Sequence, residues 1–510
     1  MRPKPVGIAS IVTLLAVAAA VLAGAAVARA SDPAAFADLK KRYEKAAKNH
    51  DDNGVRERRK LILDCFDYLD LKDCRKLLRD SFDGSDDSVD TRTATVQVLG
   101  ASGDPKDLDL IVKGIARDKL RAPTIAIGEG LACTATETAA VASAHAVELA
   151  GKSKGDLRFA LFEGVAELGD AAAYDSLAAL SDKWPPDEHC MRDVALGACG
   201  REKAVAALAA DAKHANPTVR LGAVLGLAKT GAKESLAPLT DALHDLDPRV
   251  VEAAAAALGA AKHQPASSAL VDAMATAPLR LKCTLRAALA AIVGKDYGLD
   301  AAAWRSVLDG KKPEPPVVAA GDPKMPQFFG IPVASDRVVV VLDLGKRMSW
   351  QGRLARAQDG ITQYLDSLGD TASFNVWSCA KFTDRFSKGM TGGAAARGQA
   401  SAWVRKQLTS SGFNLKAALA QILEEERDAD TILLATDLMP WGDGAAETAM
   451  ECVEEFRRAN LTRRVHLDIA FVVPGGRLAT SEPDEEFEDR AKMLELMAKT
   501  SGGTFVRVDK

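Results

Sequence analysis

A period of 31 residues is the feature that most constrains the fold of this 510-residue chain. Four positions recur at that spacing: Pro217, Val219, Leu227 and Leu239 return as Pro248, Val250, Leu258 and Leu270. Each unit opens with a capping residue and a proline, in Asn216-Pro217 and Asp247-Pro248, which is typical of a helix start. One helical hairpin cannot bury its own apolar face, whereas stacked neighbours can. We therefore predict an α-solenoid of about seven two-helix units over residues 87–310, preceded by an N-terminal helical segment over residues 31–86.

Composition limits the classes of function. The chain is 47% hydrophobic, 5% aromatic and 27% charged, with a formal net charge of -4. Such a chain has enough apolar residues to fold, so disorder is excluded as its dominant state. Because nothing in it is strongly basic, we expect no nucleic-acid partner.

The N-terminus predicts export. Arg2 and Lys4 precede an apolar run over residues 6–27, which ends in the small-residue pattern Ala28-Arg29-Ala30. This is typical of a signal peptide over residues 1–30, and it predicts a periplasmic or secreted protein. The alternative is an uncleaved helix, since a run of this length can also span a bilayer. Only in that case do we expect a membrane association.

Cysteine and histidine give no metal-binding motif. Eight cysteines follow residue 30, and none forms a CxxC pair. Cys65 and Cys74 flank a predicted turn, so they are the candidate disulfide in an oxidising compartment. The seven histidines are scattered without an HExxH sequence, and we expect them at the surface or at helix ends.

A second domain follows a proline-rich linker over residues 311–329, which cannot continue a helix. Over residues 330–510, apolar runs alternate with amphipathic stretches, which predicts an α/β domain with a doubly wound, Rossmann-like sheet. The predicted strands cover residues 338–342, 373–378, 432–435, 465–473 and 504–508. Asp343 and Asp437 directly follow two of them, at the sheet edge where ligands bind in such folds.

Both halves resemble known families. The repeats resemble short HEAT repeats, which implies protein binding or spacing. Residues 330–510 resemble a von Willebrand factor A (VWA) domain. The carrying segments are the entry into the first strand (Phe329–Met348), Ser411-Gly-Phe-Asn-Leu415, Thr436-Asp437 and Ser501-Gly-Gly-Thr-Phe505.

The VWA resemblance implies a metal-ion-dependent adhesion site (MIDAS), with the pattern D-x-S-x-S, a later Thr and a later Asp. The five positions are occupied here by Asp343, Gly345, Arg347, Phe413 and Asp437. The two aspartates are kept, and the three hydroxyl side chains are lost. Mg²⁺ prefers six oxygen ligands, so the loss of three hydroxyls predicts that no metal or other cofactor binds. We hypothesise that Arg347 bridges the two carboxylates in place of the metal. An empty site, or a Mg²⁺ ion held by Asp343 and Asp437, are the alternatives.

Trp350 and Trp441 follow the two kept aspartates and are expected on the rim of this site, either as partner contacts or as fillers beneath a loop. No nucleophile, base and oxyanion set is assembled, so we expect no enzyme. The sequence as a whole predicts a non-enzymatic, exported scaffold for an unknown protein partner. The alternative is a Mg²⁺-dependent VWA adhesion protein.

Overall fold

The computed structural model describes residues 32–50, 52–83, 88–118, 121–180, 183–311, 325–412, 414–437, 449–473 and 484–508. The chain divides into two compact units, Met1–Ala261 and Lys262–Lys510. Among the described residues, no helix is both long enough and apolar enough to span a bilayer. The predicted signal peptide lies outside the described residues.

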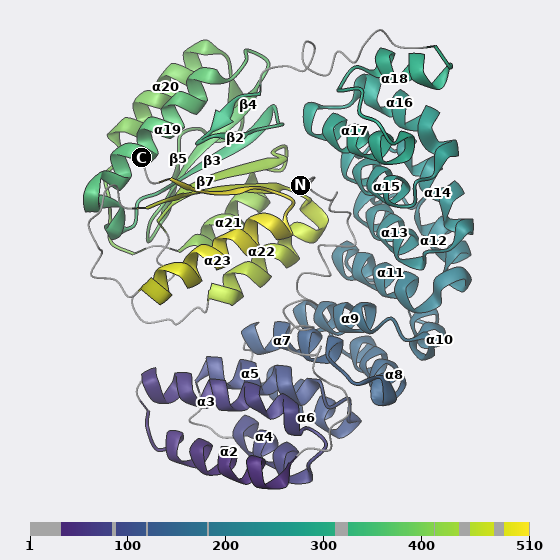
Figure 1. The fold of residues 1–510 in the computed structure, drawn as a ribbon, viewed down its shortest axis with the longest axis vertical. Coiled ribbons are helices and arrows are strands. Elements are labelled where there is room, and N and C mark those ends of the chain that lie inside the picture. The colour runs from purple at the N-terminus through teal and green to yellow at the C-terminus, as the bar shows by residue number, and fades with distance from the viewer. Residues whose placement is uncertain are drawn as a thin grey trace. The chain divides into compact units, whose positions relative to one another are not determined.

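The first unit is helical throughout its described part. Its helices are α2 (Pro33–Ala46), α3 (Asp52–Asp64), α4 (Lys72–Asp83), α5 (Val89–Gly100), α6 (Pro105–Asp118), α7 (Arg121–Ala132), α8 (Thr136–Lys152), α9 (Asp156–Leu168), α10 (Tyr174–Ala178), α11 (Pro186–Gly200), α12 (Val205–Asp211), α13 (Pro217–Thr230), α14 (Leu236–Asp241) and α15 (Pro248–Ala260). In the later repeats, α11, α13 and α15 form one row and α10, α12 and α14 form the other (Figure 1). The predicted helical array is therefore confirmed.

The predicted caps are also present. The Asn216 side chain accepts the backbone N–H of Thr218 at 2.8 Å, and Asp247 accepts that of Arg249 at 2.9 Å. Pro217 and Pro248 are the first residues of their helices. A backbone N–H at that position has no partner within the helix, so the N–H that proline lacks costs no hydrogen bond. The repeat signature in the sequence is thus the signature of a helix start.

Small residues let successive helices of one row approach closely. A Cβ atom at Gly226 of α13 would lie 2.4 Å from the Asp193 carbonyl oxygen of α11. A Cβ atom at Gly222 would lie 2.4 Å from the Cys190 Cα atom. Both positions therefore require glycine if α11 and α13 are to keep their distance.

The second unit contains three more helices and the α/β domain. The three helices are α16 (Ser267–Thr276), α17 (Leu279–Val293) and α18 (Ala301–Leu308). The strands are β1 (Gln327–Phe328), β2 (Ile331–Pro332), β3 (Arg337–Asp343), β4 (Ser373–Cys379), β5 (Thr383–Arg385), β6 (Thr391–Gly392), β7 (Thr431–Thr436), β8 (His466–Val472) and β9 (Phe505–Val508). The helices between them are the 3-10 turn η7 (Lys346–Gly352) and α19 (Arg353–Ser367), α20 (Ala394–Lys406), α21 (Leu415–Glu425), α22 (Ala449–Arg463) and α23 (Asp484–Thr500).

The main sheet has the order β5-β4-β3-β7-β8-β9, and β3, β4, β7, β8 and β9 are parallel. Helices α19 and α20 cover one face, and α21, α22 and α23 cover the other (Figure 1). Val338 and Val340 pack on the first face and Val339 and Val341 on the second, which explains the unbroken apolar run. The doubly wound fold is confirmed.

The hairpin of β1 and β2 was not predicted. Gln327 pairs with Pro332, and Phe328 is fully buried in the same core as α19. The folded α/β domain therefore begins inside the range predicted to be linker. Residues 312–324 of the predicted linker lie outside the described residues, and proline content could not mark where its last residues join a core.

Candidate functional site

The strand order identifies the carboxyl ends of β3 and β7 as the candidate site. From β3, the chain passes to β4 on one side and later to β7 on the other, so the order reverses at β3. Ligand sites in open α/β sheets lie at the carboxyl ends of strands, at such a reversal. Asp343 ends β3 and Thr436 ends β7, and Leu342 pairs with Ala435 one residue earlier. The two predicted aspartates therefore meet here.

Asp343 is buried and accepts hydrogen bonds at both oxygens. The Gly345 N–H donates to Oδ1 at 2.6 Å, and the Thr436 hydroxyl donates to Oδ2 at 2.6 Å. Burial, followed by the neighbouring Asp437 carboxylate, raises the pKa of Asp343 to about 8. The hydrogen bonds act in the opposite direction but do not outweigh these two causes. The fold therefore favours the protonated form of Asp343.

Asp437 is held by an arginine that the sequence analysis did not single out. The Arg353 Nη1 atom donates a hydrogen bond to the Asp437 Oδ2 atom, and both residues are buried. Arg353 opens α19, where the helix dipole disfavours a cation. Its position is therefore explained by the buried carboxylate rather than by the helix.

The local backbone aims Arg353 at this carboxylate. Gln351 and Gly352 both have positive φ values, 52° and 71°, and together they reverse the chain before α19. For Gln351 this conformation is uncommon, so the turn is maintained by its surroundings. Met348, three residues earlier, is fully buried in the core beside α19 and fixes the start of the turn.

Arg347 lies near the site but not at its centre. Its Nε atom is 3.8 Å from the Asp437 Oδ2 atom, and its guanidinium lies 5.4 Å from the centroid of the Trp350 ring. Arg347 therefore pairs with Asp437, and Arg353 makes the shorter bond to the same oxygen. The predicted bridge from Arg347 to Asp343 stays a prediction. A glycine turn followed by an arginine at a helix start is the signal that could have identified Arg353.

The other predicted site residues are placed as follows. Gly345 is buried and contributes only its backbone N–H. Trp350 is 48% exposed, in agreement with a rim position. Phe413 and Trp441 lie outside the described residues. Cys65 and Cys74 are buried free thiols, and the Cys74 Sγ atom lies 3.6 Å from the Cys65 carbonyl oxygen.

Backbone hydrogen bonds join three loops at this edge of the sheet. The Leu344 N–H donates to the Cys379 carbonyl at 2.8 Å, and the Ser410 N–H donates to the Leu344 carbonyl at 2.7 Å. These bonds join the loops over residues 344–352, 380–382 and 407–412. Each loop exposes one large apolar side chain: Trp350, Phe382 (79% exposed) and Leu408 (78% exposed). We call these three residues, together with Lys346, Arg347 and Lys381, the carboxyl-edge surface.

Comparison with known families matches both halves. Residues 202–290 match HEAT repeats, and residues 336–473 match the von Willebrand factor type A domain. The chain is thus a helical repeat region followed by a VWA domain with a mostly parallel sheet. No curated protein matches it.

Three solved structures show a weak similarity. A von Willebrand factor type A protein from Catenulispora acidiphila has a TM-score of 0.28 and 18% identity, over 35% of this chain and 40% of that chain. The conserved hypothetical protein BatB from Bacteroides thetaiotaomicron has a TM-score of 0.26 and 17% identity, over 34% and 90%. The CpcE–CpcF complex of phycocyanin lyase from Nostoc sp. PCC7120 has a TM-score of 0.25 and 15% identity, over 49% and 87%. Nothing about function follows from these three similarities.

Proposed function

We propose that this protein is an exported, non-enzymatic interaction protein whose VWA domain binds a protein partner without a metal ion. HEAT repeats and VWA domains are commonly protein-interaction modules, which supports the general class. The observation that carries the metal-free part is the buried hydrogen bond from Arg353 to Asp437. A guanidinium there supplies the positive charge that the carboxylates need.

The donor set does not fit Mg²⁺, which prefers oxygen ligands in octahedral geometry. Where the family has two serines, this chain has Gly345 without a side chain and Arg347, which can only donate hydrogen bonds. The nearby Ser349 hydroxyl donates to the Lys346 carbonyl at 2.7 Å, so it is directed at its own turn. The charge balance also works without a metal, because a protonated Asp343 leaves one carboxylate beside one buried guanidinium.

The non-enzymatic part is supported by the chemistry of the same edge. The Cys379 thiol ends β4, and burial, followed by the Asp343 carboxyl, raises its pKa. A catalytic thiol needs a lowered pKa instead. The thiol therefore suits a core position and not a nucleophile.

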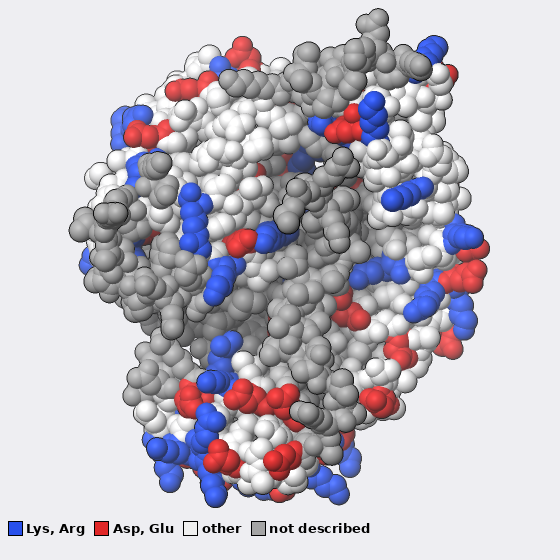
Figure 2. All heavy atoms as spheres, viewed as in Figure 1, with Lys and Arg blue, Asp and Glu red and all other residues white. Residues whose placement is uncertain are grey.

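We further propose that the partner docks on the carboxyl-edge surface. The described residues of its three loops include three basic side chains and no acidic one. Two of the cations lie over aromatic rings: Arg347 over Trp350, and Lys381 over Phe382 at 5.7 Å. Exposed apolar anchors beside cations suit a protein segment with apolar and acidic side chains. Figure 2 shows basic and acidic side chains interspersed over the helices of the N-terminal region, without one broad basic area on that face.

Affinity capture from an envelope fraction of the source organism tests this proposal. The bait is the mature chain, compared with Trp350→Ala/Phe382→Ala/Leu408→Ala and with Leu246→Ala. Leu246 is 99% exposed in the repeat region and serves as the matched control. We expect the triple variant to lose the partner and the control to keep it, with EDTA having no effect.

The alternative is a Mg²⁺-dependent binding protein, favoured by the two aspartates at the ends of β3 and β7. It predicts that EDTA abolishes capture and that calorimetric titration detects Mg²⁺ or Mn²⁺ binding at micromolar concentrations. Either result would refute the metal-free proposal.

A further inference from the structure

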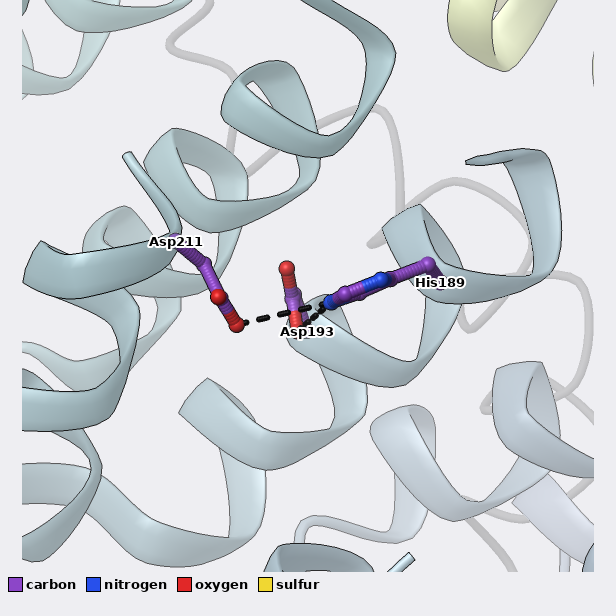
Figure 3. Close-up of side chains that lie close together, drawn as sticks. All are labelled: His189, Asp193 and Asp211. Carbon is purple, nitrogen blue, oxygen red and sulfur yellow. Dashed lines mark hydrogen bonds and ion pairs between the residues drawn. The ribbon is translucent and has the colours of Figure 1, made fainter. Parts of the chain in front are cut away.

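A second buried polar cluster lies in the repeat region, on helices of the first unit. His189 and Asp193 are one turn apart on α11, and Asp211 ends α12. The His189 Nε2 atom is 3.6 Å from Asp193 Oδ1 and 3.4 Å from Asp211 Oδ2. Figure 3 shows the imidazole edge directed at the two carboxylates. Of the two expected positions, surface or helix end, His189 takes the second: it lies in the first turn of α11 and is only 2% exposed.

Arg192 is the cation at the centre of this cluster. Its Nη2 atom lies 2.8 Å from His189 Nε2, 2.7 Å from Asp193 Oδ1 and 2.9 Å from Asp211 Oδ2. A guanidinium can only donate, so a hydrogen bond from Arg192 to His189 requires Nε2 to accept. The tautomer with the proton on Nδ1 accepts in this way, and it is also the form that binds a metal ion through Nε2.

The cluster has more negative than positive charge for a buried site. One guanidinium faces two carboxylates, and the fully buried Asp193 keeps its Oδ2 atom without a hydrogen-bond partner among the described residues. A buried carboxylate with an unpaired oxygen is costly, and a second positive charge would relieve that cost.

We propose that His189, Asp193 and Asp211 form a binding site for a divalent transition metal ion of the zinc class, in competition with the Arg192 guanidinium. The three ligand atoms all lie within 4.8 Å of one another. Ligands about 2.0–2.2 Å from zinc at tetrahedral angles lie about 3.3–3.6 Å apart. The two distances from His189 Nε2 match this spacing. Nitrogen and carboxylate ligands with one open position are a usual zinc set.

The position of Asp211 determines how an ion reaches the site and which helices the bound ion would join. Its side chain is 25% exposed, whereas those of His189 and Asp193 are buried, so an ion enters past Asp211 as Arg192 turns outward. The bound ion would join α11 to the end of α12, two helices of the same part of the array. The site is therefore structural, and it is independent of the function proposed for the VWA domain.

Metal titration of the full mature chain tests the site. After dialysis against EDTA, we expect calorimetry to detect one Zn²⁺ per chain with a micromolar or tighter Kd. Co²⁺ should give the intense visible absorption of a tetrahedral site, a readout that requires no variant. We expect His189→Gln and Asp193→Asn each to weaken binding at least tenfold. Arg192→Met should strengthen it by a similar factor, because the competing cation is gone. His244→Gln, at an exposed histidine of the array, should leave it unchanged.

Three outcomes would overturn the proposal. The first is no Zn²⁺ or Co²⁺ binding by the wild type at millimolar concentrations, even if Arg192→Met binds, since Arg192 would then hold the site permanently. The second is binding that survives His189→Gln, which would place the ion elsewhere, for example on a thiol. The third is a Co²⁺ spectrum of octahedral type. Circular dichroism of each variant verifies that lost binding does not come from misfolding.

Discussion

Replacing Arg353 with methionine is the most informative perturbation of the VWA domain. Methionine keeps much of the aliphatic volume but removes the cation that donates to Asp437. Asp437 would then be a buried carboxylate beside the Asp343 carboxyl, with Arg347 Nε still 3.8 Å away. Removing one partner of a buried ion pair typically costs about 3–5 kcal/mol, because the other charge stays unpaired.

Arg347→Met is the matched control for this variant. Arg347 makes a longer contact with the same oxygen and also packs over Trp350, so we expect it to cost about 1 kcal/mol. The double variant Arg353→Met/Asp437→Asn removes both buried charges together. It should recover most of the lost stability, since an apolar and a neutral side chain replace the pair.

Urea unfolding followed by tryptophan fluorescence measures these differences. Four of the six tryptophans lie in residues 330–510, and Trp377 is buried in the VWA core. At an m-value shared by all variants, the midpoint of Arg353→Met should fall by the largest amount. If Arg353→Met costs less than Arg347→Met, the assignment of Arg353 as the cation of the site is refuted. A full cost in the double variant would show that the loss comes from packing instead.

Three further predictions concern titration, thiols and packing. The fold raises the pKa of Asp343 to about 8 from the ordinary 3.8, so the native form keeps a proton that the unfolded chain releases. The free energy of unfolding should therefore fall as pH rises between these two values, by about 1.4 kcal/mol per pH unit at most. Asp343→Asn should remove this slope in pH-dependent urea unfolding; an unchanged slope would contradict the protonated form. The interaction with the Cys74 thiol, together with burial, raises the pKa of Cys65, and the Cys74 Sγ atom lies 3.6 Å from the Cys65 carbonyl oxygen. The two thiols are therefore close, and non-reducing peptide mapping should find them linked after export but not after cytosolic expression. Gly226→Ala should destabilise the repeat region by about 1–3 kcal/mol, because the new Cβ atom would meet α11. The control is Gly398→Ala on α20, where no atom lies within 4 Å of the new Cβ, and it should stabilise the chain by about 0.5–1 kcal/mol. Equal effects of the two variants in thermal unfolding would contradict the close approach of α11 and α13.

The sequence predicts the elements of this fold better than its polar contacts. The 31-residue period and the buried valine runs each reflect a local rule, repeated along the chain, so the helices and parallel strands follow from them. Asp343 and Asp437 could be placed together because parallel strands share a carboxyl edge. Arg353 could not, because its direction depends on two positive φ values just before α19. The burial of His189 could not be predicted because its partner Asp211 comes from another helix, although the spacing to Asp193 is visible in the sequence.

The two buried clusters each place an arginine beside carboxylates that could hold a metal ion, but their ligand sets differ. In the VWA domain Arg353 meets Asp437 at the site where we propose that the hydroxyl ligands of the family are missing, so removing the arginine should leave too few oxygens for Mg²⁺. In the repeat region Arg192 touches three complete ligand atoms, so removing it leaves an assembled set for zinc. Arg353→Met should therefore gain no Mg²⁺ binding, whereas Arg192→Met should gain affinity for Zn²⁺. The two titrations distinguish an arginine that replaces a lost metal site from one that competes for an intact site.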